Sequence, residues 1–232
     1  MKFQLKNFPF GSLFDNWKLK IEHSRSARGF ALLELLVAVV LFGIITAFVL
    51  FSYQKVSEQL FMTTLAFETA LSLRQAQSYG VSVRQFGADS SATFEAAYGV
   101  HFDAAVSDRF VFFADTDENG RYTAGGDDSG GCIHVPTSEC INVYRIKPSN
   151  RIEKFCAARA TNDGDECSTG TPTALTVLDV MFLRPNPDSI FYTNRSEAGT
   201  TYKSATIHLI SPNDLRRRVE VWNTGQISIK SS

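Results

Sequence analysis

The sequence lacks both a dominant charge and the motifs of common catalytic sites. Its 23 Lys and Arg residues almost balance its 24 Asp and Glu residues, so the net charge of −1 provides no basic field for nucleic acid. It contains no G-x-S-x-G, P-loop or H-E-x-x-H motif. Its four histidines show no paired spacing, which favours structural roles for them. We therefore expect a protein that is not an enzyme.

Charge is also nearly absent from residues 30–51. As a helix, a run of this length spans roughly 33 Å, enough to cross a bilayer. It is too long for the apolar core of a secretory signal peptide, and Phe51-Ser52-Tyr53-Gln54 offers no small-x-small cleavage site. Because Lys and Arg predominate in residues 1–29, we expect a cytoplasmic N-terminus and an extracytoplasmic chain after Phe51.

Glu34 is the only charged residue of the apolar run. A charge inside hydrocarbon is unfavourable, so this carboxylate needs a partner. One alternative is that Glu34, about 6 Å from the start of the helix, extends to the membrane interface. A plain single-pass anchor would explain the length and orientation of the run. It would explain neither Glu34 nor the basic leader that ends at Gly29.

Residues 29–40, Gly-Phe-Ala-Leu-Leu-Glu-Leu-Leu-Val-Ala-Val-Val, resemble the N-terminal processing motif of the type IV pilin and pseudopilin family. The resemblance implies that a prepilin peptidase removes residues 1–29 by cutting between Gly29 and Phe30, and then methylates the amino group of Phe30. Glu34 becomes the fifth mature residue, a position that the family uses in assembly. The implied partners are other pilin or pseudopilin subunits and an inner-membrane assembly platform.

Cleavage would give Glu34 a charge partner. The new amino group of Phe30 is a cation about one helical turn from the carboxylate. When two such helices pack with an axial offset, the carboxylate of one can meet the amine of the other, and both charges are neutralised where an unpaired charge is costly. Filament-forming family members commonly carry a proline near the end of this segment. Residues 46–51 contain none, so we expect a straight, continuous helix.

Apolar residues continue at three- and four-residue steps beyond the apolar run. This pattern predicts an amphipathic extension of the helix over residues 52–80, with periodicity to about Ser78 and Gly80 as the stop. We expect its apolar stripe to be buried under the following domain, and pairing in a coiled coil is the alternative. The stripe comprises Tyr53, Val56, Leu60, Thr64, Phe67 and Leu71.

Residues 81–232 have the pattern of an extracytoplasmic β-rich domain. The clearest alternation flanks Asn223-Thr224-Gly225, as expected for a β-hairpin. A helix followed by antiparallel strands predicts an α+β fold with the sheet packed on the helix. This order also resembles the minor-pseudopilin branch of the family. The expected strands lie within residues 98–102, 110–114, 141–146, 175–183, 190–193, 205–210 and 218–229.

All four cysteines lie in this domain. An even number in an extracytoplasmic domain indicates disulfides, although four cysteines allow three pairings. Closure of short loops between strand-like segments favours Cys132–Cys140 and Cys156–Cys167. The alternatives are free thiols or a zinc site, but no C-x-x-C spacing or nearby His pair supports zinc. Residues 156–174 are rich in Thr, Asp, Gly and Ser and predict an exposed loop.

Residues 115–121, Asp-Thr-Asp-Glu-Asn-Gly-Arg, match D-x-D-x-N-G, the first half of a calcium-binding loop. The twelfth position of the loop is Gly126 instead of the usual glutamate, although acidic residues follow at once. The alternative is a solvated acidic turn, because Asp, Asn and Gly are common turn residues. We expect no obligatory cofactor, and calcium as the candidate ion. Its ligands would come from Asp115, Asp117, Asn119, the carbonyl of Arg121, and Asp127.

Taken together, these features predict a structural subunit of a type IV pilus or of a type II secretion pseudopilus. It would be anchored in the inner membrane with its C-terminal domain outside the cytoplasm, and would then enter the filament. The alternative is a single-pass, membrane-anchored module that binds a ligand and does not polymerise. Cleavage after Gly29 distinguishes the two.

Overall fold

The computed structural model describes residues 32–82, 96–126, 128–132, 138–147, 149–161, 164–170, 174–196 and 201–231. The chain divides into two compact units, Met1–Leu50 and Phe51–Ser232. One α-helix, α1 (Leu32–Val81), begins in the first unit and ends in the second. It runs without interruption over 50 residues, as the absence of proline predicts.

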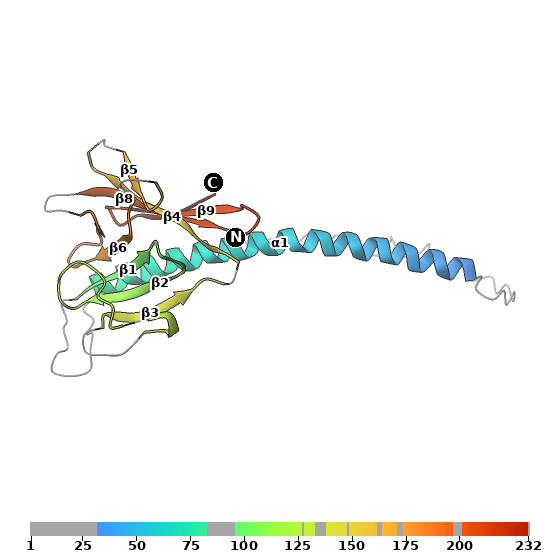
Figure 1. The fold of residues 1–232 in the computed structure, drawn as a ribbon, viewed down its shortest axis with the longest axis horizontal. Helices are drawn as coiled ribbons and strands as arrows, with labels where there is room; N and C mark the ends of the chain where they lie inside the picture. Colours follow the sequence, from blue (N-terminus) through green and yellow to red (C-terminus); the bar gives the residue numbers. More distant parts are fainter. Residues whose placement is uncertain are drawn as a thin grey trace, which may run out of the picture. The chain divides into compact units, whose positions relative to one another are not determined.

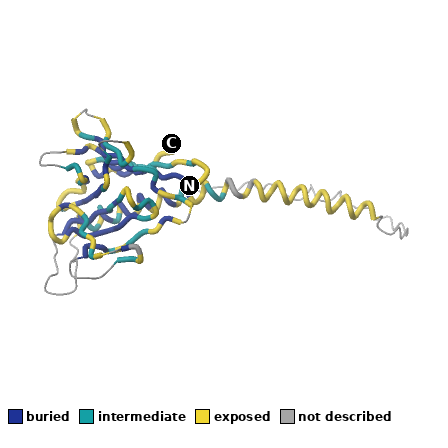
Figure 2. Tube along the Cα trace, viewed as in Figure 1, coloured by how far each residue is buried: buried dark blue, intermediate teal, exposed yellow. Residues whose placement is uncertain are grey.

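The described part of the first unit is the apolar portion of α1. Every residue from Leu32 to Leu50 is exposed in the isolated chain (Figure 2). Apolar side chains cover the whole circumference here, which is typical of a helix surrounded by lipid or by other helices. By length and composition alone, α1 qualifies as a helix that can cross a membrane. This agrees with the span expected from the sequence.

The second unit contains two five-stranded antiparallel sheets that lie along the C-terminal half of α1 (Figure 1). The first sheet has the order β3-β2-β1-β6-β7, and the second has the order β10-β9-β8-β4-β5. The strands of the first sheet are β1 (Ala97–Asp103), β2 (Val106–Asp115), β3 (Cys140–Arg145), β6 (Val177–Phe182) and β7 (Ser189–Thr193). Those of the second are β4 (Arg151–Arg159), β5 (Asp165–Cys167), β8 (Tyr202–Ile210), β9 (Arg216–Trp222) and β10 (Ile227–Ser231). A short 3₁₀ helix, η1 (Asp128–Gly130), follows the acidic loop.

One hydrophobic core joins the helix to both sheets. Leu73 of α1 is fully buried in it, together with Phe102 of the first sheet and Ile207 of the second. The helix followed by antiparallel strands therefore forms the α+β, pilin-like architecture that the sequence predicts. The hairpin of β9 and β10 is also confirmed, with Val221 opposite Ile227 and Gly225 at a φ of 78° in the turn.

The prediction of which helix face is buried is wrong. The stripe from Tyr53 to Leu71 is exposed, and α1 contacts the sheets through the opposite face. That face consists mostly of small residues, which allow the helix backbone to approach the strands closely. The prediction failed because it assigned the face with the larger apolar side chains to the core. The buried face comprises Met62, Leu65, Ala66, Thr69, Ala70, Ser72, Leu73 and Ala76.

Gly80 has a role other than the predicted stop. The helix continues to Val81, and Ser82 still donates its backbone N–H to the carbonyl of Ser78. A Cβ atom at position 80 would collide with the backbone carbonyl of Phe182 in β6. Glycine is therefore required for close contact between helix and strand.

Two strands were missed within or next to the predicted loop of residues 156–174. β4 extends to Arg159, and its residues Cys156, Ala157 and Ala158 are buried instead of exposed. The short strand β5 then pairs with the end of β4. The polar residues that suggest a loop instead belong to a narrow hairpin of β4 and β5 at the edge of the second sheet, where few residues reach the core.

Candidate functional site

The processing segment lies at the start of the chain. Glu34 is in the first turn of α1, and its side chain is exposed in a single copy. It is flanked by exposed leucines, among them Leu32 and Leu33. The expected cleavage and methylation residues, Gly29 and Phe30, lie outside the described residues. Among the described residues of this unit, 32–50, none forms an ion pair with the Glu34 carboxylate.

The acidic loop after β2 is the main polar site of the second unit. Asp115 ends β2, and Asp117 lies two residues further on. The structure adds Glu139, which directly precedes β3, so that carboxylate oxygens of all three residues lie within 4.8 Å of one another. Asp115 and Glu139 are almost completely buried, whereas Asp117 is exposed. Two buried acids and one exposed acid therefore converge on one point.

Glu139 reaches this point because of the pairing between β2 and β3. Phe113 is opposite Cys140, and the backbone N–H of Ala114 donates to the carbonyl of Glu139 at 3.0 Å. This places Glu139 beside the end of β2. Its carboxylate accepts hydrogen bonds from the backbone N–H groups of Thr116 at 2.7 Å and Thr123 at 2.8 Å. One side chain thus holds both ends of the acidic loop.

The remaining loop residues form a compact turn around Asp115. The backbone N–H groups of Asn119 and Gly120 donate to its carboxylate at 3.2 and 2.9 Å. Gly120 has a φ of 77°, and a Cβ there would collide with the ring of Tyr192. Two independent constraints therefore require glycine at this position.

Among the other residues predicted to hold calcium, the side chains of Asn119 and Arg121 have defined partners. The Asn119 side-chain carbonyl accepts a hydrogen bond from the backbone N–H of Arg121 at 2.7 Å. The Arg121 guanidinium donates to the carbonyl of Thr193 at 3.3 Å, so its charge is directed to β7 and not to the acidic cluster. Asp127 lies outside the described residues.

The electrostatics of the cluster favour a cation. Burial, and then the neighbouring charges of Glu139 and Asp117, raise the pKa of Asp115 to about 6, despite the opposing hydrogen bond from Gly120. Burial also raises the pKa of Glu139. Within the part of the chain that the structure describes, no Lys or Arg forms an ion pair with these three carboxylates. Hard oxygen ligands with excess negative charge suit Ca²⁺.

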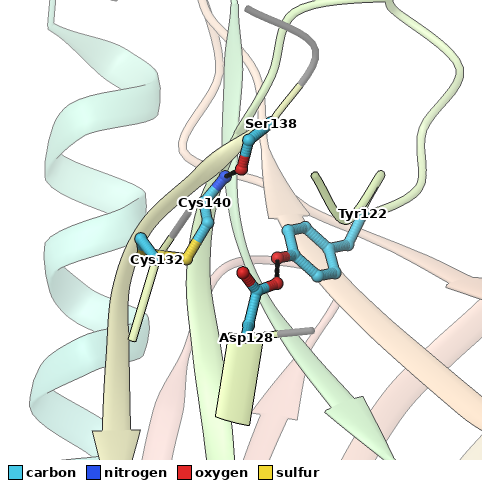
Figure 3. Close-up of a disulfide and its surroundings, with 5 residues drawn as sticks. All are labelled: Tyr122, Asp128, Cys132, Ser138 and Cys140. Atoms are coloured by element: carbon cyan, nitrogen blue, oxygen red, sulfur yellow. Dashed lines mark hydrogen bonds between the residues drawn. A yellow bond between two sulfur atoms is a disulfide. The ribbon is translucent and has the colours of Figure 1, made fainter. Parts of the chain in front are cut away.

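A disulfide lies next to this cluster. Cys132 is joined to Cys140, the residue after Glu139, and Tyr122 donates a hydrogen bond to Asp128 close by (Figure 3). Burial and the carboxylate of Asp128 raise the pKa of Tyr122, so its hydroxyl remains a donor. The loop between β2 and β3 is therefore held by a covalent bond as well as by Glu139.

The second disulfide, Cys156–Cys167, joins residues that are directly opposite in β4 and β5. Both pairs are those that the sequence favours. Among the cysteines there are no free thiols. Each bond closes a short segment, over sequence separations of 8 and 11 residues.

The raised pKa of Asp115 predicts a pH-dependent stability in calcium-free protein. The ordinary pKa of 3.8 applies to the unfolded chain and about 6 to the folded one, so the folded state binds the proton more tightly. The contribution of Asp115 to the free energy of unfolding should therefore fall as the pH rises from about 4 to about 6. Thermal melts in the presence of a chelator would measure this contribution as the difference in the free energy of unfolding between wild type and Asp115→Asn. That difference should favour wild type more at about pH 5 than at about pH 7, and a difference independent of pH would contradict the assignment.

Comparison with known proteins bears on the processing segment. Residues 24–50 match the family described as the prokaryotic N-terminal methylation motif. The chain thus carries the N-terminal methylation motif of the type IV pilin and pseudopilin family, which suggests a structural protein and not an enzyme. The motif implies processing by a prepilin peptidase and association with pilus machinery. No curated protein and no solved structure matches the chain.

Proposed function

We propose that this protein is a structural subunit of a type IV pilus or type II secretion pseudopilus, cut between Gly29 and Phe30 and methylated on Phe30. The observation that carries the proposal is the methylation motif over residues 24–50, with Glu34 in the first turn of an exposed apolar helix. The basic leader supports an N-terminus in the cytoplasm and a C-terminal domain outside it. Before assembly, α1 holds the subunit in the inner membrane.

Within this class, the features of the chain favour a specialised minor subunit. The apolar segment lacks the proline of common filament formers, and the domain is elaborated by two disulfides. A membrane-anchored binding module that does not polymerise is the competing function. Such a module would need neither a cleavage site nor an acid in its membrane helix.

The Glu34→Ala variant tests the assembly step. Cleavage should be largely unchanged, because the peptidase acts next to Gly29. Incorporation should fall by about tenfold or more, since the amine of Phe30 on a neighbouring subunit would remain unpaired in an apolar environment. Sheared filaments would be quantified by immunoblotting against total processed subunit. Glu34→Asp is the matched control, because it keeps the charge and should retain part of the incorporation. Normal incorporation of Glu34→Ala would show that the carboxylate has no role in register.

We also propose that the acidic loop binds Ca²⁺ as a structural ion. Carboxylates of Asp115, Asp117 and Glu139 would hold it, with Glu139 taking the part of the glutamate that the loop itself lacks. A bound dication would offset the mutual repulsion of these groups and fix the connection between β2 and β3. The convergence of two buried acids on one exposed acid supports this proposal over a solvated turn.

A further inference from the structure

A groove lies beside α1 at the start of the second unit. Its walls come from α1, from the connection between β3 and β4, and from the turn between β8 and β9, and its volume is about 480 Å³. This is the size of a small-molecule site. The lining is mostly apolar, and Tyr53, Phe61 and Pro212 are exposed in it. The groove can therefore receive a ligand that has an apolar part.

The groove also carries two opposite charges, Lys147 and Glu58. The Lys147 ammonium lies 4.8 Å from the centroid of the Phe61 ring. The Glu58 carboxylate accepts hydrogen bonds from the Ser211 hydroxyl and the Asn213 side chain. These neutral donors lower the pKa of Glu58, so the carboxylate stays ionised. Among the described residues neither charge has an ion-pair partner, so both are available to a ligand.

The position of the groove along the chain indicates where such a ligand comes from. Tyr53 is two residues beyond Phe51, the last residue of the apolar run. A chain advances by at most about 3.6 Å per residue, so Tyr53 lies within about 7 Å of the end of that run in any orientation of the domain. The headgroup layer on each side of a bilayer is about 5–8 Å thick. When residues 30–51 span the membrane, the groove therefore begins at the level of the lipid headgroups.

We propose that this groove binds the headgroup of a zwitterionic phospholipid that carries a primary ammonium group, as phosphatidylethanolamine does. Lys147 holds the phosphate, Glu58 accepts hydrogen bonds from the ammonium group, and the aromatic rings contact the apolar part of the lipid next to the headgroup. The trimethylated amine of phosphatidylcholine has no N–H to donate, and phosphatidylglycerol has no cation. Separate charges of opposite sign in an apolar groove thus match one class of phospholipid.

This inference rests on one part of the proposed function, the anchoring of the chain in a membrane, and does not require cleavage or assembly. The contact forms in the anchored subunit. It stabilises the domain against the membrane surface, and it must be broken when the subunit leaves the membrane.

Photo-crosslinking tests the occupant in the full chain, reconstituted in vesicles that contain phosphatidylethanolamine, phosphatidylglycerol and phosphatidylcholine in equal parts. Replacement of Phe61 by p-benzoylphenylalanine keeps an aromatic ring in the groove and should give a phosphatidylethanolamine adduct, identified by mass spectrometry. The same replacement at Leu60 is the matched control. Leu60 is exposed at nearly the same height on α1, but it lies about 100° around the helix and does not line the groove. The adduct should be about fivefold more abundant at position 61, because only that position adjoins the Lys147 charge.

Removal of the cation tests the contact with the phosphate. Lys147→Ala should lower the yield of the phosphatidylethanolamine adduct at position 61 by about fivefold. Lys203→Ala is the control and should leave the yield unchanged. Lys203 is also exposed, but it lies at the start of β8, whereas the groove adjoins the turn that follows the end of this strand.

Glu58→Gln tests the contact with the ammonium group. The variant keeps an oxygen that can accept the hydrogen bond from Ser211, but it has no charge. Adducts with phosphatidylethanolamine and phosphatidylglycerol should become equally abundant at position 61, whereas wild type should favour phosphatidylethanolamine by about fivefold. Melting temperatures close to that of wild type would show that the variants are folded.

The outcomes separate this inference from the proposed function. A chain that does not float with the vesicles would overturn both. If the chain is in the membrane, equal adduct yields at positions 60 and 61, or no loss with Lys147→Ala, would overturn the headgroup site alone. Equal yields of the two lipids in wild type would overturn the assignment to a zwitterion, and an adduct with a protein in place of lipid would identify a different occupant. A chain that is never cleaved after Gly29, but gives the predicted adducts, would overturn only the pilin proposal.

Discussion

Replacement of Gly29 by alanine should leave the chain at its full 232 residues when it is expressed together with a prepilin peptidase. Wild type should lose residues 1–29 and carry a methyl group on the new amino terminus at Phe30. Glycine lacks a Cβ atom, so it allows close approach of an enzyme to the backbone at the cleaved bond, which any side chain would obstruct. Intact-mass and N-terminal mass spectrometry would distinguish the two products directly.

The control is Ser26→Ala, which changes the same leader without touching the cleaved bond. It should be processed as efficiently as wild type. Because we expect nearly complete cleavage of wild type and almost none of Gly29→Ala, partial expression or poor folding would not give the same result. If the wild-type chain stays intact beside an active peptidase, the pilin assignment is wrong and a membrane-anchored binding module is the better explanation. The same experiment therefore decides between the two functional classes.

Glu139→Gln should abolish the stabilisation of the domain by Ca²⁺. In wild type, saturating Ca²⁺ should raise the free energy of unfolding by about 2.7 kcal/mol at a concentration 100 times the dissociation constant. The variant loses one ligand charge. It also directs an NH₂ group toward backbone N–H donors of Thr116 or Thr123, which should cost a further 1–3 kcal/mol or so without the ion. Thermal melts in Ca²⁺ and in chelator would measure both effects.

The control for this prediction is Glu166→Gln in β5. Glu166 is also a shielded carboxylate, and it contacts Arg159 and Tyr202 in the second sheet. Its loss should lower stability with and without Ca²⁺ alike. If wild type itself shows no rise in melting temperature with Ca²⁺, the acidic segment is a turn held together by Glu139 and does not bind this ion.

The α+β fold was predictable because its signals are local. Apolar alternation in 218–229 and the Asn-Thr-Gly turn correspond to the hairpin of β9 and β10, and periodicity after Phe51 corresponds to the rest of α1. β4 and β5 were harder to predict from the sequence. Most of β4 precedes the polar stretch, and β5 has only three residues, so their identity depends on pairing with β8 and with each other.

The acidic site was half predictable. Asp115, Asp117, Asn119 and Gly120 are close in sequence and match a known loop pattern. Glu139 lies 22 residues beyond Asp117, and no spacing rule connects them. One signal was present, an acid directly before a cysteine at the start of a strand. Its meaning depends on the register of β3 against β2, which brings Glu139 beside Ala114.

The sequence alone determined the processing motif, the apolar helix and its single acid, because a membrane segment is specified by contiguous residues and by the solvent around them. Only the tertiary structure decided which face of α1 is buried. Both faces carry apolar residues at helical spacing, and the sheets select the one whose small side chains permit close packing. That choice leaves Tyr53 to Leu71 exposed. The tertiary structure also brings Glu139 to the acidic loop, because the pairing of β2 with β3 joins segments that are distant in the sequence.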